Sequence, residues 1–156
     1  MSTLDVTVSD VIDSPAEAVY GALGAIEDIP RRDAAVRRIE FLSDQRSGAG
    51  TRFRETRAMG KRLVETELEV TEAVPGESIR FVSDAGGTVW DTLYSCAPEG
   101  SGGLATRLTI AMEARPDKLL PKLTNRLILP LVRRGMAKHL RELKAHCEAA
   151  HPSLGT

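Results

Sequence analysis

The sequence predicts an α+β fold, in which about seven antiparallel strands and two short helices precede one long C-terminal helix. Three observations lead to this class: alternating apolar and polar residues along most of the chain, short links between the alternating segments, and an apolar stripe at helical spacing near the end. Short links favour antiparallel neighbours, because parallel strands need a long crossover. With 156 residues, 42% of them hydrophobic, we expect a single domain over 1–156 with a core of its own.

The chain opens with a strand and two short helices. Residues 4–13 alternate apolar and polar side chains, which is typical of a half-buried strand. The next segment, Ser-Pro-Ala-Glu at 14–17, predicts a helix start, with Ser14 as the N-cap and the glutamate three residues later in a capping box. A second short helix is expected over 26–32, with an interruption at Pro30.

Six further strands are expected before the long helix. Each is rich in apolar residues that share one face, and turns containing glycine, proline or small polar residues separate them. They span residues 36–43, 51–59, 63–71, 78–83, 88–96 and 104–114. Together with the opening strand, these segments make the seven-stranded sheet.

The C-terminal part predicts one long amphipathic helix. Its apolar residues follow the spacing that one face of a helix requires. They are Leu120, Leu123, Leu127, Leu131, Val132, Met136, Leu140, Leu143 and Cys147. Pro130 should kink or divide this helix, because proline lacks a backbone donor and its ring clashes with the preceding turn.

Charge and composition exclude several classes of protein. The net charge of −1 argues against a dedicated nucleic-acid binder, and no apolar run approaches the ~20 residues that span a bilayer. We expect no export signal, and two cysteines without a disulfide framework favour a cytoplasmic location. Residues 115–156 hold 9 basic and 3 acidic side chains. A solvated helix face is the expected reason, and attraction to an acidic membrane surface is the alternative.

Four segments carry a resemblance that extends over residues 4–149. They read VSDVIDSPAEAVY at 8–20, GTRFRETR at 50–57, EAVPGE at 72–77 and TRLT at 106–109. In these segments and in its order of elements, the chain resembles the START-like or SRPBCC superfamily, also called the helix-grip fold. That superfamily includes the birch-pollen allergen and the polyketide cyclase/dehydrase proteins.

The resemblance implies a curved seven-stranded antiparallel sheet wrapped around the long C-terminal helix, with a cavity between them. It does not define a function, because members include carriers, cyclases, hydrolases and chaperone regulators. Many members carry a tryptophan after the second short helix, where this chain reads Pro30-Arg31-Arg32-Asp33. The resemblance therefore implies that one aromatic wall of the usual cavity is missing.

Strand parity and the helical stripe predict which residues face this space. The inward set is mostly apolar with a few polar groups, a composition shared by small-molecule pockets and ordinary cores. The candidate ligand-binding residues are Phe53, Glu55, Arg57, Met59, Val64, Thr66, Leu68, Phe81, Trp90, Thr92, Tyr94, Leu108, Ile110, Met112, Leu131 and Met136.

Three of these candidates, Glu55, Arg57 and Tyr94, are also candidates for catalysis. Glu55 and Arg57 point the same way from one strand, and inside a cavity their charges would need each other or a ligand. The alternative places the pair at the cavity mouth, or turned outward by a bulge. Trp90 and Tyr94 could orient an aromatic or polyene ligand, or be plain core residues. His139 is expected as a half-exposed surface histidine, with a pocket base as the alternative.

The leading hypothesis is the binding of a small hydrophobic ligand, such as a lipid, a polyketide or an aromatic metabolite, between sheet and helix. The alternative is an enzyme of the polyketide cyclase/dehydratase type, in which polar cavity residues move protons. A weaker third hypothesis is an interaction module that docks its basic helix on a membrane or partner. The chain has no phosphate loop, zinc-binding helix, nucleophile elbow or dinucleotide fingerprint, so neither a cofactor nor a metal is expected.

Overall fold

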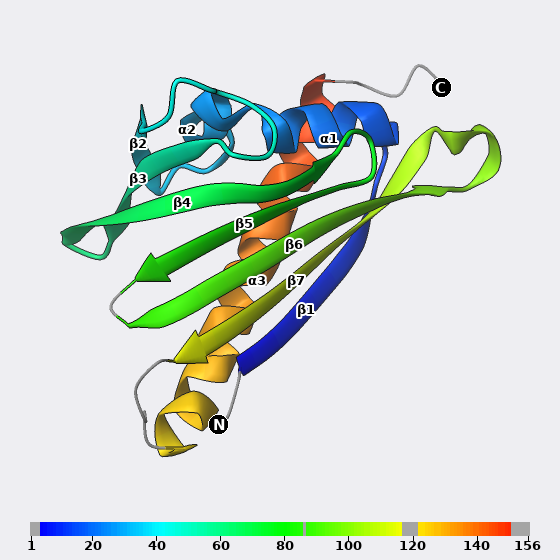
Figure 1. Cartoon of the computed structure of the whole chain (residues 1–156). Helices are drawn as coiled ribbons and strands as arrows, with labels where there is room; N and C mark the ends of the chain where they lie inside the picture. The colour runs from blue at the N-terminus through cyan, green and yellow to red at the C-terminus, as the bar shows by residue number, and fades with distance from the viewer. Residues whose placement is uncertain (1–3, 86, 117–121, 151–156) are drawn as a thin grey trace.

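A computed structural model describes residues 4–85, 87–116 and 122–150 (Figure 1). In chain order its elements are β1 (Leu4–Ile12), α1 (Ala16–Gly24), the 3-10 helix η1 (Ile26–Asp28), α2 (Ile29–Arg32), β2 (Val36–Phe41), β3 (Arg52–Met59), β4 (Arg62–Val74), β5 (Ser78–Ala85), β6 (Thr88–Glu99), the 3-10 helix η2 (Ser101–Gly103), β7 (Ala105–Pro116) and α3 (Lys122–Ala150). None of the helices in these ranges is long and apolar enough to cross a membrane.

The strands form one antiparallel sheet in the order β1-β7-β6-β5-β4-β3-β2. Strand β1 pairs with the last strand, β7, so β1 and β2 lie at opposite edges although they are neighbours in the sequence. Helices α1, η1 and α2 connect these two edges across one end of the sheet, and the sheet curves around α3 (Figure 1). The predicted α+β helix-grip fold, with its seven-stranded antiparallel sheet, is confirmed.

Strand ends differ from the predicted ends by three residues or fewer. Strands β4 and β6 continue to Val74 and Glu99 because their hairpin partners extend the pairing that far. Val74 pairs with Ser78 of β5, and Glu99 pairs with Ala105 of β7. Cross-strand pairing, rather than the alternation within one strand, therefore sets where each strand stops.

Helix α3 packs on the sheet through the predicted apolar stripe. Four residues of the stripe are buried: Met136, Leu140, Leu143 and Cys147. Leu131 is 66% exposed, because it lies roughly 100° around the helix from Val132, which packs against the core. Leu120 lies outside the described residues, and so do the side chains of Leu123 and Leu127.

Pro130 does not divide α3, which continues through it as one helix. The proline is exposed, so water can hydrate the carbonyl one turn earlier that loses its donor. The packed stripe that follows keeps the chain helical beyond this point. Of the two predicted effects of Pro130, division of the helix is therefore wrong, and a kink stays a prediction.

The predicted capping box at Ser14 and Glu17 is also wrong. Helix α1 begins after Pro15, which occupies the N-cap position, and no side chain caps the helix. The Ser14 N–H donates to the Ile12 carbonyl at 2.8 Å, and the Ser14 carbonyl accepts from Thr106 Oγ1 at 2.7 Å. These bonds tie Ser14 to the sheet, and its buried hydroxyl has no partner among the described residues.

The segment predicted as one interrupted helix over 26–32 forms two helices, η1 and α2. Pro30 lies in the first turn of α2, where a helix needs no donor from it. The interruption therefore precedes the proline instead of falling at it. This short helix brings Ile29, Arg32 and Asp33, which are all buried, to the space between the sheet and α3.

Backbone pairing aligns inward side chains in rows across the concave face of the sheet. In one row, Val70 of β4, Phe81 of β5, Thr92 of β6 and Met112 of β7 are successive partners. Val70 is completely buried, whereas Thr92 and Met112 remain partly exposed although they face inward. The sheet and α3 do not meet at these residues, so a space remains between them.

Candidate functional site

That space is a cavity of about 380 Å³ between the concave face of the sheet and α3. Its apolar lining comes from α2, from five strands and from α3. These residues are Ile29, Phe53, Leu68, Phe81, Trp90, Ile110, Met112, Val132 and Met136, together with Gly135. Its polar lining consists of Arg32, Asp33, Glu55, Arg57, Thr92, Tyr94 and His139.

Aromatic rings form a continuous series along one side of the cavity. Phe53 and Phe81 meet edge to face with centroids 6.1 Å apart, and Phe81 meets Tyr94 in the same way at 5.7 Å. The His139 ring continues the series at 6.0 Å from Tyr94. Edge-to-face contacts are a favoured geometry for aromatic pairs, so these rings stabilise each other's orientation as well as lining the space.

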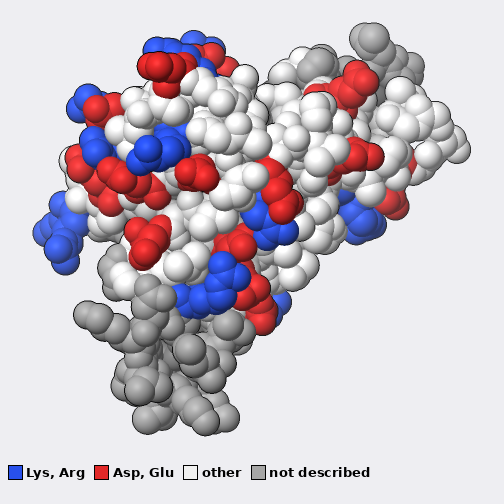
Figure 2. Space-filling view, in the orientation of Figure 1, with Lys and Arg blue, Asp and Glu red and all other residues white. Residues whose placement is uncertain are grey.

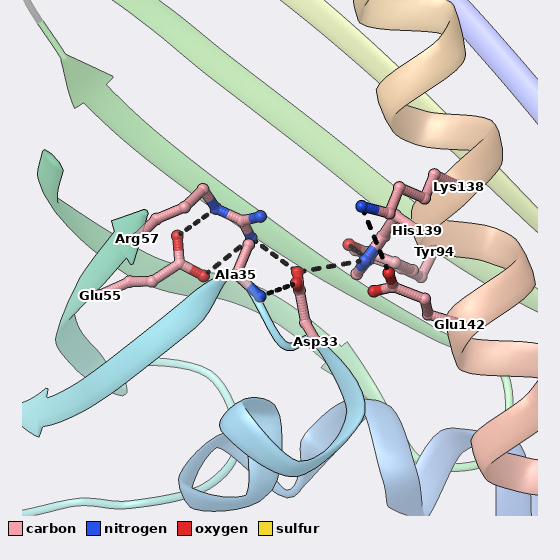
Figure 3. Close-up of polar contacts among 8 residues, drawn as sticks. All are labelled: Asp33, Ala35, Glu55, Arg57, Tyr94, Lys138, His139 and Glu142. Atoms are coloured by element: carbon pink, nitrogen blue, oxygen red, sulfur yellow. Dashed lines mark hydrogen bonds and ion pairs between the residues drawn. The ribbon is translucent and has the colours of Figure 1, made fainter. Parts of the chain in front are cut away.

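Asp33, Glu55 and Arg57 form an ion-pair cluster at the polar side of the cavity (Figure 3). The Arg57 guanidinium lies 2.9 Å from Asp33 Oδ2 and 3.3 Å from Glu55 Oε1. The other Asp33 oxygen accepts from the Ala35 N–H at 3.1 Å, which orients the carboxylate. Burial opposes the charge of Arg57, but the two carboxylates outweigh it and raise the pKa of Arg57.

The inward placement of Glu55 and Arg57 follows from β3, where they are two residues apart on the cavity side. Arg57 is 35% exposed, whereas the Asp33 side chain is only 5% exposed. The cluster therefore reaches from the interior toward the cavity mouth. The sequence left open whether these charges face the cavity, and the structure places both of them in its lining.

Tyr94 and His139 make a second polar contact in the cavity, from β6 and α3 (Figure 3). The Tyr94 hydroxyl is hydrogen-bonded to His139 Nε2 at 2.9 Å. His139 Nδ1 lies 3.8 Å from Asp33 Oδ2, which is too long for a hydrogen bond but places the ring beside the ion-pair cluster.

Both members of this pair are neutral at pH 7. Burial lowers the pKa of His139 to about 4, and the positive charges of Arg32 and Arg57 act in the same direction. Burial also raises the pKa of Tyr94 to about 12. A neutral imidazole bonded to a neutral phenol can orient a ligand oxygen or exchange a proton with it.

Metal binding has no support in the described ranges, where no three His, Cys, Asp or Glu side chains gather as a metal site would require. The two cysteines, Cys96 and Cys147, are buried and unpaired. Burial raises the pKa of the Cys96 thiol to about 11 and raises that of Cys147 as well, so both remain thiols at pH 7.

The family of this protein follows from its sequence. Residues 3–148 match the family described as polyketide cyclase / dehydrase and lipid transport. The chain belongs to this family. The predicted resemblance to a superfamily that includes the polyketide cyclase/dehydrase proteins is thereby confirmed. Among curated proteins, none matches the sequence.

Solved structures share the fold of this family member. A Zhui aromatase/cyclase from Streptomyces sp. R1128 has a TM-score of 0.80 at 12% identity, covering 99% of both chains. A START superfamily protein from Mycobacterium smegmatis has a TM-score of 0.72 at 15% identity, covering 94% of this chain and 98% of that one. Truncated norcoclaurine synthase from Thalictrum flavum has a TM-score of 0.74 at 13% identity, covering 97% and 96%. At these identities the similarity concerns the fold.

Most of the predicted ligand-binding residues lie at the cavity of this family member. Those in its lining are Phe53, Glu55, Arg57, Leu68, Phe81, Trp90, Thr92, Tyr94, Ile110, Met112 and Met136. Their contact with a ligand remains a prediction. The resemblance implied that an aromatic residue is missing from the segment after the second short helix. In this segment the charged residues Arg32 and Asp33 line the cavity.

Five predicted lining residues lie elsewhere. Met59 and Val64 are exposed near the tip of the β3–β4 hairpin, because the hairpin extends beyond the part of the sheet that α3 covers. Leu131 is exposed on the outer side of α3. Leu108 is completely buried in the core, and Thr66 is half-buried opposite Glu55, outside the lining. For Met59, Val64 and Leu131, the prediction of an inward position is wrong.

Sequence reasoning missed six lining residues: Ile29, Arg32, Asp33, Val132, Gly135 and His139. His139 was expected as a half-exposed surface histidine, with a pocket base as the alternative, and it lies in the cavity lining and bonds to Tyr94. Its position three residues after Met136 and four before Leu143 is the helical spacing that could have found it. No comparable signal marks Asp33, which follows α2 in a connection without periodicity.

Proposed function

We propose that this protein binds a small, largely apolar molecule that carries a polar head. The supporting observation is the cavity of about 380 Å³, whose wall is mostly aliphatic and aromatic and whose polar groups gather around Asp33. Such a lining is typical of small-molecule sites, in which a few polar groups set the orientation of an apolar ligand. Membership of the family favours the same classes of ligand: a lipid, a polyketide or an aromatic metabolite.

In the proposed complex, the apolar body of the ligand packs against Phe81 and Met112, and its head reaches Tyr94 and His139. Each CH₂ group removed from water contributes about 0.8 kcal/mol to binding. The neutral Tyr94–His139 pair offers hydrogen bonds to the head without the desolvation cost of a free charge. Affinity then comes from the apolar wall, and orientation comes from the polar side.

The test is to extract the purified protein with organic solvent and identify any bound compound by mass spectrometry. An apolar fluorophore provides a second measurement that does not depend on knowing this compound. Met112→Trp replaces a flexible side chain in the cavity by a bulky indole ring and should weaken fluorophore binding at least tenfold. Met59→Trp adds the same ring at a position that is 59% exposed, and should leave affinity unchanged. Circular dichroism checks that both variants fold.

Equal fluorophore affinity in the wild type and both folded variants would place the dye elsewhere and contradict the proposed cavity site. Loss of affinity in both variants would indicate a general effect of the added tryptophan, which also counts against it. Only a loss confined to Met112→Trp supports binding in the cavity.

A second candidate function is an enzyme of the cyclase/dehydratase type. The observation that favours it is the Tyr94–His139 hydrogen bond of 2.9 Å, with Asp33 3.8 Å from the other ring nitrogen. This arrangement can pass a proton between a ligand oxygen and the imidazole. Glu55, a catalytic candidate from the sequence, has both carboxylate oxygens within 3.5 Å of Arg57. We propose that Glu55 positions Arg57 and that Glu55→Gln weakens binding of a polar head with little effect on chemistry.

The two candidate functions differ in what happens to the extracted compound. As a carrier, the protein returns it unchanged, and Glu55→Gln lowers its affinity. If the wild type converts the compound, while His139→Gln binds it equally well without converting it, the enzyme replaces the carrier. We also infer a cytoplasmic location, which the two unpaired buried cysteines favour.

A further inference from the structure

Arg32 differs from the other charged residues of the cavity in having no ionic partner among the described residues. It lines the cavity and is only 7% exposed. Its guanidinium makes no hydrogen bond to a described residue, and its enclosed Nε has no acceptor. Arg57, in contrast, lies within 3.3 Å of two carboxylates.

The carboxylates of Asp33 and Glu55 accept hydrogen bonds from other donors. One Asp33 oxygen accepts from the Ala35 N–H, and the other accepts from Arg57. Both Glu55 oxygens accept from Arg57. Arg32 thus lines the cavity, and no described residue accepts a hydrogen bond from its Nε.

A buried guanidinium is costly without a partner, because arginine keeps its charge at physiological pH. Burial lowers the pKa of Arg32, because it disfavours the charged form. A ligand group that binds the Arg32 guanidinium would offset this free-energy cost. The favourable partner is an anion whose two oxygens match the planar fork of the guanidinium.

We propose that the ligand of this cavity carries a carboxylate and that Arg32 binds it. This inference rests on the proposed binding function and adds the class of ligand: an apolar monocarboxylic acid, such as an aryl or alkyl carboxylic acid. The Arg57 ion pairs offset much of the negative charge of Asp33 and Glu55, which reduces their repulsion of the incoming carboxylate.

Two neutral groups complete the carboxylate site. Arg32, Tyr94 and His139 all line the cavity, and the Tyr94 hydroxyl is hydrogen-bonded to His139 Nε2. The Tyr94–His139 pair can therefore provide a second hydrogen bond to a carboxylate held by Arg32. The apolar part of the ligand then extends along Phe81 and Met112.

The test compares 4-phenylbutanoate with its uncharged isostere 4-phenylbutanamide, by calorimetric titration at pH 7. We expect the carboxylate to bind the wild type at least tenfold more tightly than the amide. Arg32→Gln should lower carboxylate affinity on the order of tenfold to a hundredfold, while amide affinity changes less than threefold. Arg31→Gln is the matched control, since it removes an adjacent charge whose side chain is 80% exposed, and it should keep the preference.

The outcomes separate the two proposals. Equal wild-type affinity for carboxylate and amide overturns the carboxylate assignment and leaves the apolar cavity site standing. Binding of neither compound contradicts both proposals. If Arg32→Gln does not fold, the wild-type comparison still decides. Arg32→Lys, which keeps the charge but not the planar fork, should then retain part of the preference, and an unchanged preference would overturn bidentate binding.

Discussion

Two arginines of β3 allow a comparison of the same side chain on the two faces of the sheet. Arg54 and Arg57 are three residues apart and point to opposite faces. Arg54 lies 3.0 Å from Glu40 and 2.9 Å from Glu67. Arg57 likewise lies between two carboxylates, Asp33 and Glu55, on the cavity side.

The two clusters differ in their surroundings. Glu40 and Glu67 are direct cross-strand neighbours of Arg54 on the outer face, where basic and acidic side chains intermingle (Figure 2). Their charges are hydrated and screened by salt, so such pairs contribute little to stability. The two arginines are similarly exposed, but the carboxylates beside Arg57, Asp33 and Glu55, are only 5% and 15% exposed. Removing Arg57 therefore leaves two uncompensated charges that are largely withdrawn from water. The comparison teaches that burial, rather than the pairing pattern, decides the energetic weight of these groups.

The largest expected effect is the pH dependence of protein stability that results from His139 on the inner face. Its pKa is lowered from 6.5 to about 4, so between these values the unfolded chain binds a proton that the folded chain does not. Stability should therefore fall as the pH decreases from 6.5 to 4, by about 3 kcal/mol in total from this group. Above pH 6.5 the group is neutral in both states and contributes no slope.

Denaturant unfolding of the wild type and His139→Gln across this pH range measures the effect. The variant lacks the titrating ring, so its free energy of unfolding should decline less steeply than that of the wild type. Parallel curves from pH 6.5 to 4 would show that His139 is not buried as a neutral group.

The second effect compares the two arginines directly. Arg57→Gln should lower the free energy of unfolding by about 2 kcal/mol, less than for a fully buried pair because Arg57 is 35% exposed. Arg54→Gln should lower the free energy of unfolding by clearly less, and raising the salt concentration should reduce this loss further. Urea unfolding of both variants at low and high salt provides the measurement. A larger loss of stability for Arg54→Gln than for Arg57→Gln would contradict the conclusion that the inner ion pairs contribute more to stability.

The smallest effect compares one side-chain hydrogen bond on each face. Tyr94→Phe removes the 2.9 Å bond to His139 and should cost about 1 kcal/mol. Thr109→Val removes the exposed 3.3 Å contact with Ser9 and should change stability by less than about 0.5 kcal/mol. Thermal unfolding at pH 7 distinguishes the two. Equal losses of stability in the two variants would mean that burial does not strengthen the contribution of the Tyr94–His139 hydrogen bond.

The sequence by itself determined the elements and their faces. Alternation within the strands identified most inward residues, among them Phe53, Phe81 and Met112, and helical spacing identified the buried side of α3 from Met136 to Cys147. Parity also placed Glu55 and Arg57 on one face, because side chains two residues apart on a strand share a face, but it left open whether this face meets the cavity.

Only the tertiary structure decided how these faces are covered and which charges meet. Met59 has the parity of Phe53 but is exposed, because no helix covers the hairpin near its tip. Asp33 meets Arg57 across 24 positions of sequence, and the neighbouring Arg32 is enclosed without a partner among the described residues. Periodicity describes one element at a time, whereas the site forms where α2, the sheet and α3 converge, and that convergence depends on packing between elements that no local pattern records.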